Sequence, residues 1–254
     1  AFVKIDMKYQ KIKGAYKFVI RLCNCASDKG PCARNIAIFS SLSDEELFKI
    51  VHMTEHKEFD ENDTLCREGE ISDKLFLIRE GEVKICKITK EGKEQIVYLL
   101  SKGDFFGENN LFVNSNISNF SAYAITSGKM CVLNKKSLDK ILLENPEISI
   151  KIIEEMANRI NLAENLAQNL ATKDVEVRIA SVLVEFMNRY GIEKEEGIYV
   201  KLPLNREQMA NYCGVTRETV SRKLSKFDKT GIINLHGNKA IIIKDIEALL
   251  DLAE

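Results

Sequence analysis

The feature that most constrains the fold is a change of hydrophobic period part-way along the chain. Between residues 60 and 135, apolar and β-branched residues fall in short runs. These runs are separated by glycines, at Gly69, Gly81, Gly92 and Gly103. Such a pattern is typical of a small β-sandwich or barrel. After Pro146 the apolar residues recur every three or four positions, which is the helical period. The sequence therefore predicts an α+β fold with a jelly-roll-like barrel followed by helices.

Length and charge set the number of domains and the class of partner. The chain has 254 residues, of which 45% are hydrophobic and 30% charged, which suits two globular domains. Its formal net charge is −1, so any charge that binds nucleic acid must be local. No apolar run is long enough to cross a bilayer, and residues 1–10 lack the order of a signal peptide. We expect no membrane partner and a cytoplasmic location.

Changes of pattern place four segments along the chain. Residues 1–35 carry three cysteines and little periodicity, and Gly30-Pro31 marks a turn, so a loop is expected there. Residues 36–145 form the predicted barrel, 146–172 a long helix, and 173–254 a C-terminal domain that begins with a new helix from Val175 to about Tyr190.

The long helix carries a narrow apolar stripe. Its members are Ile148, Ile152, Met156, Ile160, Ala163, Ala167 and Leu170. Such a stripe fits either a core helix lying on its own barrel or a helix paired with a copy of itself. We favour the pairing, because the other faces are polar. The predicted homodimer interface consists of Ile152, Met156, Ile160, Ala163, Ala167 and Leu170.

Residues 206–224 have the pattern of a helix-turn-helix. Two helices that cross steeply need a small residue at the contact, which Ala210 supplies, and a residue that tolerates positive φ at the turn, which Gly214 supplies. Val220 is placed to be buried between the two helices, and Thr216 to cap the second one.

The outward face of the second helix carries groups that can read DNA. Arginine pairs with guanine and a carboxylate accepts from cytosine. The predicted DNA-binding residues are Thr216, Arg217, Glu218, Ser221 and Arg222, with Lys239 on a hairpin wing near the phosphates. The alternative, an ordinary solvated face, explains less, because small, glycine and apolar residues all occupy the offsets that the motif requires.

The seven cysteines are unevenly spaced along the chain. Three of them, Cys23, Cys25 and Cys32, lie within ten residues. An odd number in a reducing compartment argues against a disulfide framework. Cys66 and Cys86 lie in apolar strand patterns and Cys213 on the packed side of the first motif helix, so these three are expected to be buried core thiols.

The order of barrel, long helix and winged helix-turn-helix resembles the CRP/FNR family of bacterial regulators. Local matches are Leu75–Lys84 (LFLIREGEVK), Gly103–Glu108 (GDFFGE) and Arg217–Arg222 (RETVSR). The resemblance implies a cyclic-nucleotide-binding-like barrel, a homodimer, a palindromic double-stranded DNA operator and contact with RNA polymerase. Within the family, the pattern Glu218-x-x-Ser221-Arg222 is similar to the FNR branch.

The branches of this family differ in what they sense. Cyclic-nucleotide binders follow the Gly-Glu of the barrel with an arginine that clamps the cyclic phosphate. Gly107 and Glu108 are present here, but no arginine lies between Gly107 and Lys129. Because an anionic phosphate buried without a cation is costly, the sequence predicts no cyclic-nucleotide ligand.

The cysteines resemble those of the FNR branch, whose sensors hold a [4Fe–4S] cluster with three cysteines of an N-terminal loop and a fourth on a barrel strand. The resemblance implies Cys23, Cys25, Cys32 and Cys131 as the metal ligands. The loop departs from the usual spacing, since it reads Cys-x-Cys-x6-Cys rather than Cys-x2-Cys-x5-Cys. This departure is consistent with a relative tuned to nitric oxide, such as the nitrosative-stress regulators of the hybrid-cluster protein.

Other inputs stay open at this stage. The same four thiols suit a zinc site or a thiol switch, and the barrel suits a small organic ligand or haem. An enzyme fits poorly, because neither a nucleophile–base arrangement nor a glycine-rich phosphate loop is present.

Overall fold

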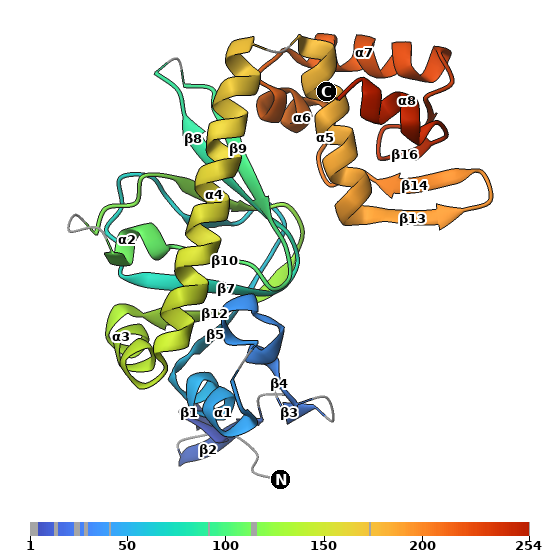
Figure 1. The fold of residues 1–254 in the computed structure, drawn as a ribbon. Helices are drawn as coiled ribbons and strands as arrows, with labels where there is room; N and C mark the ends of the chain where they lie inside the picture. The colour runs from blue at the N-terminus through green and yellow to red at the C-terminus, as the bar shows by residue number, and fades with distance from the viewer. Residues whose placement is uncertain are drawn as a thin grey trace.

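The computed structural model describes residues 5–12, 15–22, 26–27, 30–40, 42–90, 92–112, 116–172 and 174–253 (Figure 1). Side chains are described from residue 33 onward, with further gaps at 109, 162 and 165–172. The predicted α+β fold is confirmed: a β-sandwich is crossed by one long helix that leads to a helix-turn-helix domain with a small sheet.

The N-terminal segment differs from the expected loop. Strand β1 (Ile5–Ile12) pairs antiparallel with β2 (Ala15–Leu22), and β3 (Ala26–Ser27) pairs with β4 (Gly30–Pro31). The pattern that predicts the first hairpin is the alternation of apolar and polar residues in IDMKYQ, which is short and easily missed. Two short 3-10 helices, η1 (Cys32–Asn35) and η2 (Ala37–Phe39), then lead into α1 (Asp44–Met53).

The barrel consists of two four-stranded antiparallel sheets. One has the order β10-β7-β12-β5 and the other β6-β11-β8-β9. The strands are β5 (Glu55–Phe59), β6 (Thr64–Cys66), β7 (Lys74–Glu80), β8 (Val83–Ile88), β9 (Glu94–Leu100), β10 (Phe105–Phe106), β11 (Ser121–Ala124) and β12 (Gly128–Asn134). Helix α2 (Glu108–Phe112) follows β10 along the chain, and α3 (Lys135–Glu144) follows β12. A stacked pair, Phe76 and Phe106, lies in the apolar core between the sheets, with ring centroids 4.6 Å apart.

A second core lies below the barrel, and we call it the basal core. It joins η1, η2 and α1 to the outer side of β7 and β12, to α3 and to the first turns of the long helix α4 (Pro146–Thr172). Its members include Ala33, Phe39, Leu47, Leu77, Cys131, Leu133, Leu138, Ile148 and Ile152, all 6% exposed or less. The N-terminal segment, β12 and α4 are therefore packed together.

The C-terminal domain stands at the far end of α4 (Figure 1). It contains α5 (Val175–Tyr190), β13 (Gly191–Lys194), β14 (Gly197–Lys201), α6 (Arg206–Cys213), α7 (Arg217–Lys229), β15 (Ile233–His236), β16 (Ala240–Ile243) and α8 (Ile246–Asp251). The predicted wing hairpin is β15–β16, and it belongs to a four-stranded sheet of order β13-β14-β16-β15. Among the described helices, none is both long and apolar enough to cross a membrane.

Candidate nucleic-acid interface and sensor sites

The helix-turn-helix has the geometry that its residues predict. Gly214 ends α6 with φ 65° and ψ 41°, the left-handed conformation that a side chain makes costly. Ala210 and Val220 are 1% and 0% exposed at the contact between α6 and α7. The hydroxyl of Thr216 accepts from the backbone N–H of Thr219 at 3.3 Å, so Thr216 caps α7 as expected.

The predicted reading face is exposed along one side of α7. Arg217, Glu218, Ser221 and Arg222 are all exposed, whereas Leu224 and Phe227 on the opposite side are 1% exposed. Thr216 precedes this face as the cap, and its own side chain is engaged with Thr219. Lys239 is exposed beyond the tip of the β15–β16 hairpin, where Gly237 has φ 61°.

Two further lysines of α7 are held by an acidic residue that sequence analysis missed. Glu176, in the first turn of α5, accepts from Lys223 Nζ at 2.5 Å and from Lys226 Nζ at 2.6 Å. These hydrogen bonds, first from Lys223 and then from Lys226, lower the pKa of the Glu176 carboxyl. The sequence does place Glu176 at a helix N-terminus, where an acidic residue is common. It does not reveal the two lysine partners, because they lie 47 and 50 residues away.

Of the four predicted metal ligands, only Cys131 has a described side chain. Cys23 and Cys25 lie outside the described residues, and the side chain of Cys32 is not described. Cys131 lies on β12, is 4% exposed and belongs to the basal core together with Ala33, the residue after Cys32. No group of three metal-binding side chains occurs among the residues that are described.

His56 is the polar neighbour of the Cys131 thiol. The two residues face each other across the β5–β12 pair, and Cys131 Sγ lies 3.1 Å from His56 Nδ1. His56 lies on strand β5, because α1 ends at Met53 and the strand begins at Glu55.

The other three described cysteines are buried, as predicted. Cys66 is 7% exposed inside the barrel, Cys86 0% exposed on β8, and Cys213 2% exposed in the helix-turn-helix core. Burial raises the pKa of Cys86 and of Cys213 to about 12. These thiols stay protonated at neutral pH and are poor nucleophiles.

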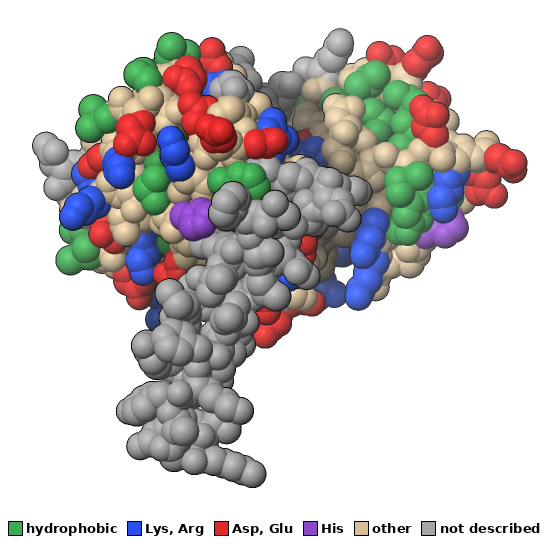
Figure 2. Space-filling model, turned by 90° about the horizontal axis from the view of Figure 1, so that it is seen from below, with side chains coloured by type: hydrophobic (Ala, Val, Ile, Leu, Met, Phe, Trp, Pro, Cys, Tyr) green, Lys and Arg blue, Asp and Glu red, His purple; other side chains and the backbone are tan. Residues whose placement is uncertain are grey.

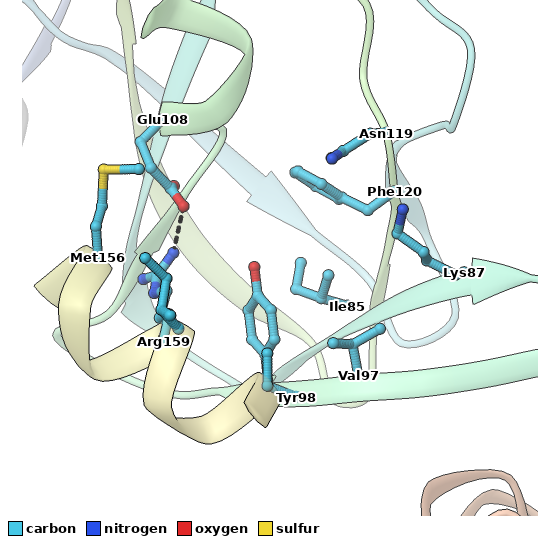
Figure 3. A pocket seen from close by; sticks show the side chains of 11 residues that line it. Ile85, Lys87, Val97, Tyr98, Glu108, Asn119, Phe120, Met156 and Arg159 are labelled. Carbon is cyan, nitrogen blue, oxygen red and sulfur yellow. Dashed lines mark hydrogen bonds and ion pairs between the residues drawn. The ribbon is translucent and has the colours of Figure 1, made fainter. Parts of the chain in front are cut away.

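A pocket of about 220 Å³ lies between the barrel and α4 (Figure 3). It is lined by Ile85, Lys87, Val97, Tyr98, Glu108, Asn119, Phe120, Met156, Arg159, Ile160 and Ala163. The premise that a ligand here would meet no cation is wrong, because α4 contributes Arg159 and β8 contributes Lys87. Arg159 was detectable from its spacing, since it lies one helical turn after Met156 on the side of α4 that faces the barrel.

Arg159 is already engaged at three of its nitrogens. Nη1 contacts Glu108 Oε1 at 2.6 Å, Nη2 donates to the carbonyl of Phe105 at 2.6 Å, and Nε donates to Glu155 Oε1 at 3.0 Å. The guanidinium carbon also lies 4.6 Å from the centre of the Phe105 ring. Glu108 Oε2 is buried and has no hydrogen-bond partner among the described residues. Burial, followed by the charge of Glu108, raises the pKa of Tyr98 to about 12.

The structure divides the apolar stripe of α4 between two faces. Ile152, predicted to face a partner, is 3% exposed in the basal core, and Met156 packs against the same core. Ile160 is 58% exposed and Ala163 is exposed as well, whereas the side chains of Ala167 and Leu170 lie outside the description. The correction has a simple cause: a helix with apolar residues on two sides satisfies both interpretations at once.

Comparison with known proteins follows the two domains. Residues 56–145 match the family model described as cyclic nucleotide-binding domain, and residues 177–252 match the Crp-like helix-turn-helix domain. In fold, the chain is similar to the solved structure of FixK2 from Bradyrhizobium japonicum, with a TM-score of 0.70 and 24% identity over 79% of this chain and 98% of that one.

Two relatives match over most of their lengths. The anaerobic regulatory protein of Bacillus subtilis is 28% identical over 80% of this chain and 86% of its own. The nitrogen fixation regulation protein FixK of Bradyrhizobium diazoefficiens is 30% identical over 83% of this chain and 88% of its own. Together with the exposed reading face on a capped recognition helix, these matches show that the chain belongs to the CRP/FNR family of DNA-binding transcription regulators, and not to an enzyme family.

Proposed function

We propose that this regulator responds to redox state or to a gas, oxygen or nitric oxide, through a [4Fe–4S] cluster held by Cys23, Cys25, Cys32 and Cys131. The observation that carries the proposal is the place of Cys131. Its thiol lies in the same packed core as Ala33, which follows Cys32, and as Ile148 and Ile152 of α4.

The donor set fits such a cluster. Four thiolates are its usual complement, and the buried Cys131 on a paired strand provides a rigid anchor. His56 stands at hydrogen-bond distance from that sulfur, and hydrogen bonds to ligand sulfurs tune both the stability and the potential of iron–sulfur centres.

The basal core supplies a route from the ligands to the long helix. When bound, the cluster provides a group whose chemistry oxygen or nitric oxide alters. The chain's own part is to fix residues 23–32 against β12, whose Cys131 and Leu133 pack in one core with Ile148 and Ile152. A change in how this segment is held therefore acts first on the packing of the first two turns of α4.

The output of the proposed switch is the spacing of two recognition helices. We infer a homodimer that pairs through α4, with the exposed Ile150, Ile153 and Ile160 at the seam. To read a palindromic operator, the two α7 helices must stand about 34 Å apart, one turn of DNA. RNA polymerase is the proposed further partner once the operator is bound.

Analysis of anaerobically purified protein tests the input. We expect brown protein with broad absorption at the blue end of the spectrum, and about four irons and four acid-labile sulfides per chain. Cys131→Ser should abolish the colour. Cys66→Ser is the matched control, because Cys66 is equally buried but lies inside the barrel, away from the basal core.

A colourless protein with one zinc bound by four thiolates would contradict the cluster and favour the structural metal site instead. Protein without any metal, whose DNA binding nevertheless follows thiol oxidation, would favour a thiol switch.

A second candidate is a small-molecule input at the barrel pocket, and the observation that favours it is Glu108. Its Oε2 atom is buried without a partner among the described residues, and such an atom calls for a donor. Since Arg159 is committed to Glu108, Phe105 and Glu155, the part of the pocket beside Glu108 favours a neutral ligand group that donates a hydroxyl or amino hydrogen over an anionic group. We therefore maintain the prediction that no cyclic nucleotide acts here.

Thermal-shift measurements test whether the pocket takes a cyclic nucleotide or haem. Cyclic AMP, which carries both a hydroxyl and an anionic phosphate, and haem are the probes, and neither is expected to raise the Tm. A rise with cyclic AMP that disappears in Glu108→Gln would instead assign the pocket as the effector site.

A further inference from the structure

The outer face of strands β8 and β9 carries buried apolar residues, as their inner face does. Val83, Ile85 and Leu100 point into the barrel core, while Cys86, Ile96 and Leu99 point out of it. The three outward residues are nevertheless only 0%, 0% and 2% exposed. An antiparallel strand that packs on one face alternates apolar and polar residues, so an apolar run such as Ile96–Leu100 requires a cover on both faces.

The cover is the C-terminal domain of the same chain. Cys86, Ile96 and Leu99 share one apolar core with residues of that domain, and α6 lies beside β9 (Figure 1). Tyr123 and Ile125, at the end of β11, pack against the same core. We call this outer face, formed by Cys86, Ile96, Leu99, Tyr123 and Ile125, the docking face.

Polar contacts surround the docking face. Arg189 Nη1, near the end of α5, donates to the carbonyl of Leu99 at 3.0 Å across the domain boundary. Glu82, just before β8, is surrounded by Lys201, Tyr190 and Arg189 of the C-terminal domain. Burial raises the pKa of Glu82 against the opposite pull of these three groups. Burial and the charge of Glu82 also raise the pKa of Tyr190, to about 12.

Docking leaves the DNA-reading face open. The docking face is covered beside α6, the first helix of the motif, whereas Arg217, Glu218 and Arg222 on α7 stay exposed. In Figure 1, α7 lies at the end of the molecule beyond the last turn of α4, with α6 between it and the barrel. The contact therefore does not block DNA by covering the recognition helix.

We propose that the docking face positions the helix-turn-helix domain for DNA, so that the barrel fixes the direction in which α7 points. Leu99 and Arg189 act as positioning residues, and neither touches DNA. The proposal needs only that α7 reads DNA, and it stands or falls independently of the cluster.

Three buried thiols make the docked state measurable. Cys66 lies in the barrel core, Cys213 in the helix-turn-helix core and Cys86 on the docking face. All three are 7% exposed or less, and burial raises the pKa of each. Alkylation followed by peptide mass mapping therefore reports barrel opening, helix-turn-helix unfolding and undocking separately.

The experiment compares Leu99→Asn with Leu143→Asn in the full-length protein. Leu143 is 83% exposed on α3, so the same substitution there leaves docking intact. In Leu99→Asn we expect faster alkylation of Cys86, unchanged protection of Cys66 and Cys213, and operator binding weakened by roughly 5- to 150-fold, the usual range for coupled sites. Bound operator should restore the protection of Cys86, because DNA binding and docking favour one arrangement.

Two results would overturn the proposal: faster alkylation of Cys86 with unchanged or tighter operator binding, or slow alkylation of Cys86 in Leu99→Asn. If Leu99→Asn also exposes Cys66 or Cys213, the chain has unfolded, and Arg189→Ala decides instead. That variant removes the hydrogen bond to the Leu99 carbonyl without placing a polar group in the core, and Arg189→Lys should recover part of the binding. If the wild type, Arg189→Ala and Arg189→Lys bind the operator with equal affinity, Arg189 has no positioning role.

Discussion

Arg159 connects more of the molecule than any other side chain of the pocket. It comes from α4 and contacts the Glu108 carboxylate at the start of α2 (Figure 3). It also donates to the carbonyl of Phe105 on β10 and stacks over the Phe105 ring. The Arg159 side chain is 11% exposed and that of Glu108 2%, so the pair is largely removed from water. Removing one partner from such a pair costs about 3–5 kcal/mol, because the other charge stays buried. α4 is thereby fastened to the barrel one turn beyond Met156.

At the reading face, two substitutions should separate base recognition from phosphate contact. Glu218→Ala removes the carboxylate that we propose accepts from a base edge, so it should relax selectivity at one base pair of each half-site by about 1–3 kcal/mol. Lys239→Ala removes the lysine that we propose contacts a phosphate, so it should weaken binding to all sequences alike and lower the salt slope by about one. Selection from random sequences and binding curves at several salt concentrations measure both effects. An equal loss for all sequences in Glu218→Ala would contradict its role in reading.

Beside the proposed cluster, His56→Ala should shorten the life of the iron–sulfur centre. The change removes the ring nitrogen that lies 3.1 Å from Cys131 Sγ, and with it a polar contact to a ligand sulfur. Iron and sulfide content over time in air, compared with wild type and with His52→Ala on the exposed side of α1, measures the effect. Identical decay in all three proteins would remove His56 from the site.

Among the elements, α4 has two apolar faces with different tasks. Ile148 and Ile152 face the basal core, whereas Ile150, Ile153 and Ile160 are 59%, 65% and 58% exposed. Exposed isoleucines at spacings of three and seven fit a seam with a second helix.

Ile153→Glu should convert the proposed dimer to a monomer, because it places two charges in an apolar seam. Residues at the centre of an interface cost about 2 kcal/mol or more when altered. Ile152→Ala should instead leave the dimer intact and lower the free energy of unfolding by about 2–5 kcal/mol, as expected for a core residue. Sedimentation and denaturant unfolding distinguish the two. If Ile152→Glu but not Ile153→Glu gives folded monomers, the dimer seam follows the apolar stripe predicted from the sequence, which includes Ile152.

Between α5 and α7, the Glu176 ion pairs should make the C-terminal domain sensitive to acid. Because the pKa of Glu176 in the folded chain lies below its ordinary value of 4.5, the contribution is complete above that pH and is lost as pH falls through the lowered pKa. Glu176→Gln should lower the unfolding free energy at pH 7 by about 0.5–1 kcal/mol. The variant should also lose less stability than the wild type as the pH falls below 4.5, and we call this part of the stability curve the acid limb. A variant as stable as wild type at pH 7, with the same acid limb, would show that the pairs contribute nothing.

The elements differ in how far the sequence predicts them. The helix-turn-helix could be predicted in detail, because Ala210, Gly214 and Val220 meet local steric needs within one short segment. The double use of α4 could not, since periodicity shows that a face is apolar but not what covers it. The partners of Arg159 and of Glu176, and the cover of the docking face, come from distant segments, and a single sequence does not record these pairings. The N-terminal hairpin was missed for a different reason, a weak alternation within a lysine-rich stretch.

At the scale of the whole molecule, packing contacts connect the DNA-binding domain to the barrel. The net charge is −1, and in Figure 2 acidic and basic side chains are interspersed over the described surface seen from below. We propose that packing orients the DNA-binding domain, through three sets of contacts that follow one another along α4. The basal core holds the start of α4, Arg159 its middle, and the docking face the domain beyond its end.

One alanine inserted between Asn161 and Leu162 should uncouple the C-terminal domain from the barrel without unfolding either domain. It turns all that follows by about 100° and advances it by about 1.5 Å. The basal core and Arg159 lie before the insertion, so iron content should be unchanged, while Cys86 should become open to alkylation and operator binding should fall. Asn161→Ala is the control, because it places an alanine at the same point of the helix without changing the helix length. Unchanged operator affinity after the insertion would show that the end of α4 does not fix the domain.

Because α4 is anchored to the barrel at Arg159, the part of the helix beyond this residue should tolerate a change of residue type better than a change of length. From Arg159 to Thr172 the helix serves as a spacer with a fixed angular phase, so its length is constrained more tightly than its composition. Among natural variants of this chain, substitutions outside the proposed dimer seam should accumulate in this stretch where insertions and deletions do not, and a change of length that does survive should come as whole turns.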